Sequence, residues 1–276
     1  MGKVIAIASQ KGGVGKTTTT VNLAASLATM KQRCLVLDLD EQNAVSFGLG
    51  LSRQKMEHGL YDVFLGRRKL GQVIQGTTLP YLKVIPYGKG TLTDEFEKFV
   101  RQQGSAALLK KYVQALRKSC DFILIDCPLG MGDLTIYALS ASDSVLVPMQ
   151  CEPLSLKTLT QILKIIRKVR RQINPELVIE GLLMTMYDEN YRIAREVCQN
   201  VWANFPEEVV FRNVIPRMEE FSTAFAVGRP IITQDPEAEV AKAYLQLAKE
   251  ILAKRKKELT EKAAAGGEDD SQIASS

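Results

Sequence analysis

A short segment near the start of the chain has the composition of a phosphate-binding loop. Residues 11–18 read KGGVGKTT, in which three glycines allow backbone N–H groups to converge on an anion. Lys16 would contact the β- and γ-phosphates of a nucleotide, and the Thr17 hydroxyl would ligate Mg²⁺. The predicted nucleotide-binding residues are therefore Gly12, Gly13, Val14, Gly15, Lys16, Thr17 and Thr18.

The spacing of this segment differs from the strict G-x-x-x-x-G-K-[ST] pattern. That pattern requires a glycine at position 10, where this chain has Gln10. The variant K-G-G-x-G-K-T-T nevertheless follows an apolar strand at 3–9 and precedes a helix at 18–30, which is the context that a phosphate loop needs. The start of that helix adds the positive end of its dipole to the anion site.

Carboxylates follow two other apolar runs. DFILID ends in Asp126, and RCLVLDLD places Asp38 and Asp40 at the end of another predicted strand. Side chains at the carboxyl ends of parallel strands face the crevice where ligands bind in open α/β folds. We expect Asp126 to hold Mg²⁺ directly or through water, and Asp40 to orient the attacking water. The predicted metal site consists of Thr17, Asp40 and Asp126.

Strands and helices alternate along the chain. Apolar runs predict strands at 3–9, 33–40, 81–86, 121–126, 143–148, 177–185 and 209–216. Helical patterns lie between them at 18–30, 105–119, 155–172 and 195–205. This order predicts an α/β fold with a mostly parallel, twisted sheet and helices on both faces.

The carboxyl-terminal part divides into a helix and a tail. An apolar stripe of Val240, Tyr244, Leu247, Ile251 and Leu252 predicts a helix docked on the core, with a membrane-binding helix as the weaker alternative. Residues 263–276 are small, polar and acidic, and we predict a disordered tail there. No linker interrupts residues 1–262, which we expect to form a single domain.

Composition narrows the class of protein. The 276 residues are 46% hydrophobic and 24% charged, as in a globular chain with a sizeable core. The net charge of +5 permits a polyanionic partner without requiring one. Five widely spaced cysteines predict reduced thiols in a cytoplasm, and no apolar run approaches the ~20 residues of a membrane span.

Several segments together resemble the ParA/Soj group of deviant-Walker P-loop ATPases, which also includes MinD. They are KGGVGKTTTTVNLAASLA, LVLDLDEQNAVSFGLGL, FILIDCPLGMGDLTIYAL, VLVPMQCEPLSLKTL, IEGLLMTMYD and the late VIPR…GRPIITQDPEAEVAKAYLQLAKEI. The D-x-D-x-Q run, the QCE segment and the late IPR are more similar to ParA than to MinD. The resemblance spans the chain from Lys3 to about Leu252.

The resemblance implies ATP and Mg²⁺ as ligands and slow ATP hydrolysis. In that family Lys11 is the signature lysine, which crosses an ATP-bound homodimer to contact the partner's phosphates. A second cation there would neutralise charge that spreads over the γ-phosphate in the transition state. The late IPR segment adds Pro216 to the ATP-binding residues. The implied catalytic residues are Lys11, Lys16 and Asp40.

Departures from the family pattern affect two regions. The family usually has a proline after the second aspartate of D-x-D and a second proline after D-x-P, where this chain has Glu41 and Leu129. Two arginines of the family's DNA-binding surface are replaced by Asn190 and Glu220. Other basic residues could compensate, by releasing counterions from DNA phosphates. An ordinary solvated surface is the alternative for all of them. The candidates are Arg192, Arg195, Arg217, Lys164, Arg167 and Arg171.

The implied function is partition or positioning of DNA or another large cargo. The ATP dimer would bind non-specific DNA on the nucleoid, and a ParB-like or other activating protein would stimulate hydrolysis. Two alternatives remain open: a MinD-like regulator at a membrane surface, without stable insertion, and a metabolic P-loop enzyme with a small-molecule pocket.

Overall fold

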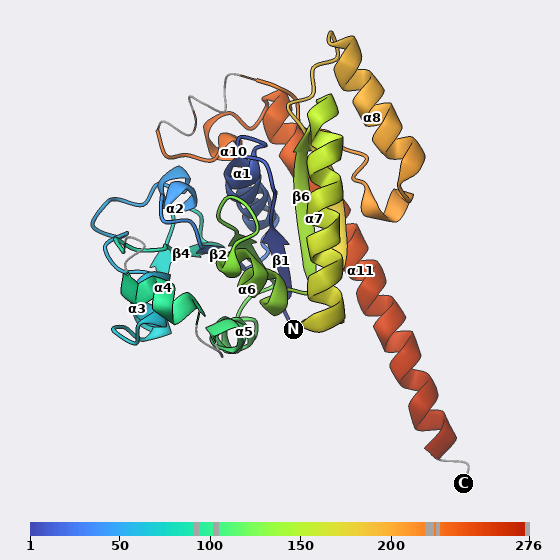
Figure 1. Ribbon diagram of the computed structural model, residues 1–276. Helices are drawn as coiled ribbons and strands as arrows, with labels where there is room; N and C mark the ends of the chain where they lie inside the picture. The colour runs from blue at the N-terminus through green and yellow to red at the C-terminus, as the bar shows by residue number, and fades with distance from the viewer. Residues whose placement is uncertain (91–93, 102–104, 219–223, 225–226, 274–276) are drawn as a thin grey trace.

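A seven-stranded sheet forms the centre of the computed structural model, which describes residues 1–90, 94–101, 105–218, 224 and 227–273 (Figure 1). The strand order is β3-β4-β2-β5-β1-β6-β7, and every pairing is parallel except that of β3 with β4. The strands are β1 (Lys3–Ile7), β2 (Cys34–Asp38), β3 (Gln75–Gly76), β4 (Leu82–Ile85), β5 (Phe122–Asp126), β6 (Ser144–Gln150) and β7 (Val178–Thr185). The predicted fold class is confirmed.

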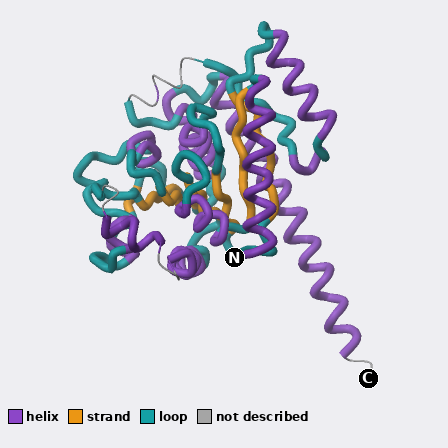
Figure 2. Tube along the Cα trace, in the orientation of Figure 1, coloured by secondary structure: helices purple, strands orange, loops and turns teal. Residues whose placement is uncertain are grey.

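Helices cover both faces of this sheet (Figure 2). The helices are α1 (Lys16–Thr29), α2 (Ala44–Gly48), α3 (Leu60–Phe64), α4 (Asp94–Arg101), α5 (Ser105–Leu116), α6 (Asp133–Ala141), α7 (Pro153–Gln172), α8 (Arg192–Asn204), α10 (Ile231–Gln234) and α11 (Glu239–Ile273). Two 3₁₀ turns, η1 (Leu70–Gln72) and η2 (Glu207–Val209), lie in the connections.

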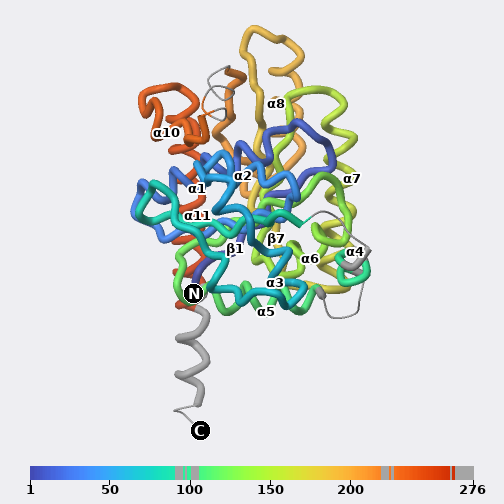
Figure 3. The backbone as a smooth tube through the Cα atoms, turned by 90° about the vertical axis from the view of Figure 1, so that its left-hand side faces the viewer, coloured from blue at the N-terminus to red at the C-terminus, as the bar shows by residue number. Residues whose placement is uncertain are grey.

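Alternate residues of each strand belong to two separate cores. Ile5 and Ile7 of β1 face α1, α10 and α11, whereas Val4 and Ala6 face the layer of α5, α6, α7 and α8. Strands covered on both faces must be apolar throughout, which is why the central runs lack polar alternation. The view in Figure 3, turned by 90°, shows α7 and α8 on one side of the sheet and α11 near the chain's start.

The last helix docks as its apolar stripe predicts. Val240, Tyr244, Leu247 and Ile251 are at most 1% exposed and pack with α1 on one core. The helix continues to Ile273, so the backbone of the predicted tail is helical up to that residue. The run Ala263–Ala265 has high helix propensity, although a helix beyond the last packed turn depends on propensity alone.

The predicted strand at 209–216 is wrong. This segment lies beside β7 but forms only isolated bridges, one between Leu182 of β7 and Val210 and one between Tyr187, two residues after β7, and Pro216. The turn η2 ends at Val209, and Pro216 has no N–H group with which to continue a ladder. The sequence did not predict the short strand β3, because two residues are too few to show the alternation of apolar and polar residues that indicates a strand.

Candidate nucleotide-binding site

The loop between β1 and α1 forms an open cup for an anion. Gly13 and Gly15 adopt φ angles of 72° and 82°, a left-handed conformation that a side chain would strain. Gly15 also precedes the first turn of α1, so the free N–H groups of that turn point toward the cup. A pocket of about 360 Å³ opens there, lined by Ser9, Lys11, Gly12, Gly13, Val14, Gly15, Lys16, Thr17, Thr18, Leu129 and Met186.

Neighbouring strands hold the loop from behind. The Thr185 hydroxyl at the end of β7 donates to the Val14 carbonyl at 2.9 Å, and the Gln150 amide at the end of β6 donates to the Gly13 carbonyl at 3.2 Å. Ser9 donates to the Lys11 carbonyl at 3.0 Å. Sequence reasoning did not assign these positioning roles, because the loop contacts residues about 140 to 170 positions away.

Asp126 is fully buried and contacts the predicted metal ligand Thr17, which lines the pocket. Its two carboxylate oxygens accept hydrogen bonds from Thr17 at 3.0 Å and from Thr20 at 2.7 Å. Burial raises the pKa of Asp126, while the nearby Lys16 and the two hydroxyls oppose that rise. A hydroxyl and a carboxylate in contact are the oxygen donors that Mg²⁺ prefers, so the residues present fit this ion.

Asp38 is a second buried carboxylate, next to Asp126 across the β2–β5 pairing. Desolvation, with a smaller contribution from Asp126, raises its pKa to about 7. Asp38 accepts hydrogen bonds from the Asp40 backbone and from both the backbone and the hydroxyl of Ser46. Asp38 therefore positions the loop that carries Asp40.

Asp40 begins that loop at the carboxyl edge of the sheet, with its side chain partly exposed. It accepts a hydrogen bond from the Gln42 backbone at 3.0 Å, which leaves carboxylate lone pairs available to a water molecule. The structure thus brings Lys16, Thr17, Asp126 and Asp40 to one edge of the sheet. Their individual roles remain predictions.

Lys11 lies at the rim of the pocket and is bound by the last residue of β6 and by a residue just after this strand. Its ammonium donates to the Gln150 side chain at 2.5 Å and to Glu152 at 2.9 Å. The Lys11 side chain is 31% exposed. Gln150 and Glu152 belong to the QCE segment, which sequence reasoning used for the resemblance without assigning them a contact.

Leu129 and Pro216 occupy different surroundings. Leu129 is 62% exposed and lies over Gly12 at the mouth of the phosphate pocket. Pro216 instead lines a separate hollow of about 610 Å³ together with Tyr187 and the start of α11. The structure therefore places Pro216 outside the phosphate cup, and its contact with ATP stays a prediction.

The predicted DNA-binding residues do not form one cluster. Arg192 pairs with Glu196 at 2.7 Å, and Arg195 donates to the Glu189 carbonyl, both at the start of α8. Arg217 is exposed after the Pro216 bridge, and Glu220 lies outside the described residues. The exposed side chains of Lys164, Arg167 and Arg171 belong to α7.

This loop combines glycine amides, two lysines and a carboxylate next to Thr17, the predicted Mg²⁺ ligand. Such a loop is typical of a P-loop ATPase with a modified Walker A segment. A family model described as an AAA domain matches residues 2–179. The sporulation initiation inhibitor protein Soj of Bacillus subtilis is 42% identical over 92% of this chain and 99% of its own length. The chromosome partitioning protein ParA of Myxococcus xanthus is 38% identical over 91% of this chain and 88% of its own. The chain belongs to the Soj/ParA family of P-loop ATPases.

Solved structures agree with the fold and with the prediction of ATP and Mg²⁺ as ligands. Cobyrinic acid a,c-diamide synthase from Mycobacterium smegmatis, with a bound ATP analog and magnesium, superposes with a TM-score of 0.79 at 30% identity, covering 93% of this chain and 96% of that one. The septum site-determining protein MinD of Pyrococcus horikoshii, complexed with Mg-ADP, gives a TM-score of 0.74 at 26% identity, covering 91% and 96%. Both proteins bind adenine nucleotide with magnesium, as their names state.

Proposed function

We propose that this chain is a partition or positioning ATPase that closes into a homodimer with ATP and Mg²⁺. The dimer binds non-specific DNA, and a ParB-like or other activating protein stimulates hydrolysis and release. The carrying observation is the position of Lys11, at the rim of the pocket and partly exposed, where it can reach a second subunit. The cargo is a plasmid, a chromosome or another large assembly.

The chain's own residues explain why ATP acts as the switch. Loop amides and Lys16 bind the phosphates, while Thr17 and Asp126 would hold Mg²⁺, which neutralises charge on the β- and γ-phosphates. Asp40 orients the attacking water. Because Lys11 is bound to Gln150 and Glu152, closure of the dimer requires it to exchange these partners for phosphate oxygens.

The test of the hydrolytic step is Asp40→Ala. We expect ATP binding to persist and turnover to fall by about 100-fold, the lower end of what a positioned base contributes. Size-exclusion chromatography with ATP should then show a persistent dimer. The exposed Glu57→Ala serves as the control and should keep the parental rate. An Asp40→Ala protein that hydrolyses ATP normally would remove Asp40 from the mechanism.

The proposed location is the cytoplasm, in association with the nucleoid. Among the described residues, no helix is both long and apolar enough to cross a bilayer. A MinD-like attachment through α11 is disfavoured, because the apolar stripe of this helix is buried against α1. Sedimentation with liposomes tests that alternative directly.

A metabolic synthase would need a second substrate next to the phosphates. The larger hollow near Pro216 and the pocket formed by the phosphate loop share no lining residue, although Met186 of one is adjacent in the chain to Tyr187 of the other. Relatives named chromosome partitioning protein ParA, at 38% and 39% identity, match over 91% and 92% of this chain. We therefore favour the partition ATPase over the synthase.

A further inference from the structure

Helix α7 carries six basic side chains and no acidic one over its 20 residues. All six are exposed, and within the described part of the chain none of them forms an ion pair. They are Lys157, Lys164, Arg167, Lys168, Arg170 and Arg171.

Four of these cations form one stripe along the helix. At 100° per residue, Lys157, Lys164, Lys168 and Arg171 fall within about 60° of one another and span roughly 21 Å of helix. The buried residues of α7, including Ile162, lie on the opposite side, against the core. In Figure 1, α7 runs along the outside of the sheet, and the four side chains of the stripe are exposed.

The candidate DNA-binding residues Arg192 and Arg195 already have partners, as does the nearby Arg212, whereas the exposed Arg217 forms no ion pair within the described part of the chain. Arg192 pairs with Glu196 at 2.7 Å, Arg212 pairs with Glu207 at 2.8 Å, and Arg195 donates to a carbonyl. Each would have to give up such a contact before it could bind phosphate. The α7 cations have no such contact to give up among the residues described.

The chemistry of the stripe selects among possible occupants. A protein interface needs apolar or aromatic anchors, but the large exposed apolar residues of α7 and its end, Leu154 and Ile173, flank the stripe at its two ends. Insertion into a lipid surface needs a free apolar helix face, and that of α7 is buried. A linear polyanion with regularly spaced phosphates matches a row of unpaired cations.

We propose that the α7 stripe is the principal surface with which this protein contacts the phosphates of duplex DNA. This inference rests on the proposed function and specifies where DNA binds. The stripe starts near Pro153, directly after Glu152, which binds Lys11. A dimer presents two stripes, so ATP-driven dimerisation doubles the phosphate contacts without any change in α7 itself.

The test compares two triple variants of equal charge. Lys164→Gln/Lys168→Gln/Arg171→Gln removes the centre of the stripe, and Lys110→Gln/Lys111→Gln/Lys118→Gln removes three exposed lysines of α5 and its end. Fluorescence anisotropy of a labelled duplex of arbitrary sequence is measured with a non-hydrolysable ATP analogue and Mg²⁺ over a salt series. For the α7 triple, we expect the slope of log affinity against log salt to fall by about 3 per protomer, and affinity at low salt to fall at least about tenfold. The α5 triple should stay near the parental values.

The outcomes separate this inference from the proposed function. An α7 triple that retains parental affinity and slope, or loses no more than the α5 triple, overturns the inference while DNA binding by the parent stands. Absence of DNA binding by the parent overturns both. Loss of binding to phosphatidylglycerol vesicles with DNA binding retained would assign the stripe to lipid and also overturn it. Unchanged ATPase activity of the α7 triple variant verifies its fold. The Lys164→Gln/Lys168→Gln double variant should lower the slope of log affinity against log salt by about 2 per protomer.

Discussion

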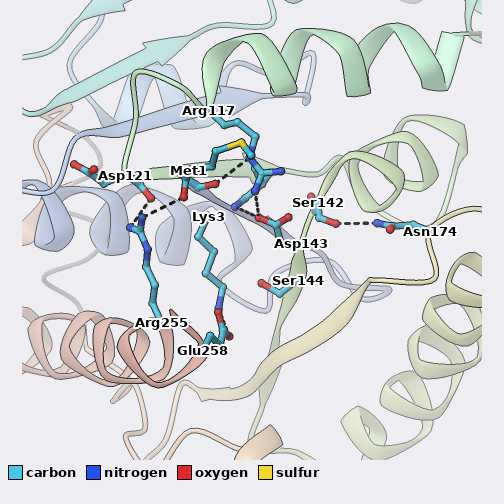
Figure 4. A network of polar contacts seen from close by, with 12 residues as sticks. Met1, Lys3, Arg117, Asp121, Ser142, Asp143, Ser144, Asn174, Arg255 and Glu258 are labelled. Atoms are coloured by element: carbon cyan, nitrogen blue, oxygen red, sulfur yellow. Dashed lines mark hydrogen bonds and ion pairs between the residues drawn. The ribbon is translucent and has the colours of Figure 1, made fainter. Parts of the chain in front are cut away.

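The amino-terminal ends of the parallel strands form one edge of the central sheet, and their carboxyl-terminal ends form the opposite edge. Buried charged groups have different partners at these two edges, called here the amino edge and the carboxyl edge. At the amino edge, Figure 4 shows cations and carboxylates from distant segments in direct contact. At the carboxyl edge, two buried carboxylates lie side by side with pKa values raised by desolvation. Charge is therefore satisfied internally at one edge and left for a ligand at the other.

At the amino edge, Lys3 is 6% exposed and binds both Glu180 and Glu258 at 2.7 Å. Arg117 binds Asp143 at 2.8 Å, and Arg255 of α11 donates to the Asp121 carbonyl at 2.6 Å. These contacts join β1, β5, β6, β7 and α11, so the network ties the last helix to the start of the chain. Its contribution is to stability, because the phosphate loop begins at the opposite end of β1.

At the carboxyl edge, neither Asp38 nor Asp126 forms an ion pair with another described residue. Asp38 is stabilised by Ser46 and by a backbone N–H, and Asp126 by two threonine hydroxyls. Folding without a ligand therefore carries an electrostatic cost at this edge. Binding of a metal with the nucleotide removes part of that cost, which couples stability to the ligand.

The largest expected effect comes from the amino edge. Lys3→Met leaves Glu180 buried without its cation and should lower the free energy of unfolding by about 3–5 kcal/mol. Urea denaturation measures this change. Glu258→Gln is the control, because Glu258 is 44% exposed and its loss should matter far less. Equal effects of the two variants would show that burial does not distinguish these contacts.

The next effect concerns pH at the carboxyl edge. The pKa of Asp38 is about 7 in the folded chain and lower when unfolded, so folding takes up a proton and stability falls as pH rises toward 7. Between about pH 5 and about pH 7 this group should cost the ligand-free protein about 2–3 kcal/mol.

Asp38→Asn removes this titration and should flatten the decline in unfolding free energy, measured with urea at several pH values. The control Glu57→Gln changes an exposed carboxylate and should follow the parental profile. A parental decline that Asp38→Asn leaves intact would assign the proton uptake to another group.

A third effect is on ligand binding. Lys16→Ala removes a charged donor to the phosphates and should weaken ATP binding by about 2 kcal/mol or more, roughly 30-fold. Calorimetry with Mg-ATP measures it, and Lys118→Ala on the exposed end of α5 is the control. Thermal stability without ligand should change little, in contrast to Lys3→Met. Normal ATP affinity in Lys16→Ala would contradict the site.

The smallest effect is expected from the tail. Removal of residues 263–276 should leave Tm, ATP binding and turnover unchanged, because Ile251 is the last fully buried residue of α11 among those whose burial the structure describes. Scanning calorimetry and an ATPase assay measure this. A marked fall in Tm would extend the proposed domain beyond residue 262.

The sequence predicted local structure most successfully where many adjacent residues belong to one apolar run or one motif. The continuous apolar runs predicted six of the seven strands, and KGGVGKTT predicted the phosphate loop, because its chemistry lies within eight adjacent residues. Prediction failed at 209–216, where an apolar run lies beside β7 without a ladder. Strand pairing depends on a partner's register, which the run itself does not contain.

By itself, the sequence determined the α/β class, the phosphate loop and the family. Tertiary structure alone decided that Gln150 and Glu152 bind Lys11, that Asp38 and Asp126 share a buried edge, and that the α7 cations form no ion pair with any residue the structure describes. The physical reason is that backbone conformation and core patterning follow from neighbouring residues. Charge pairing, by contrast, depends on side chains brought together from segments as much as 255 residues apart.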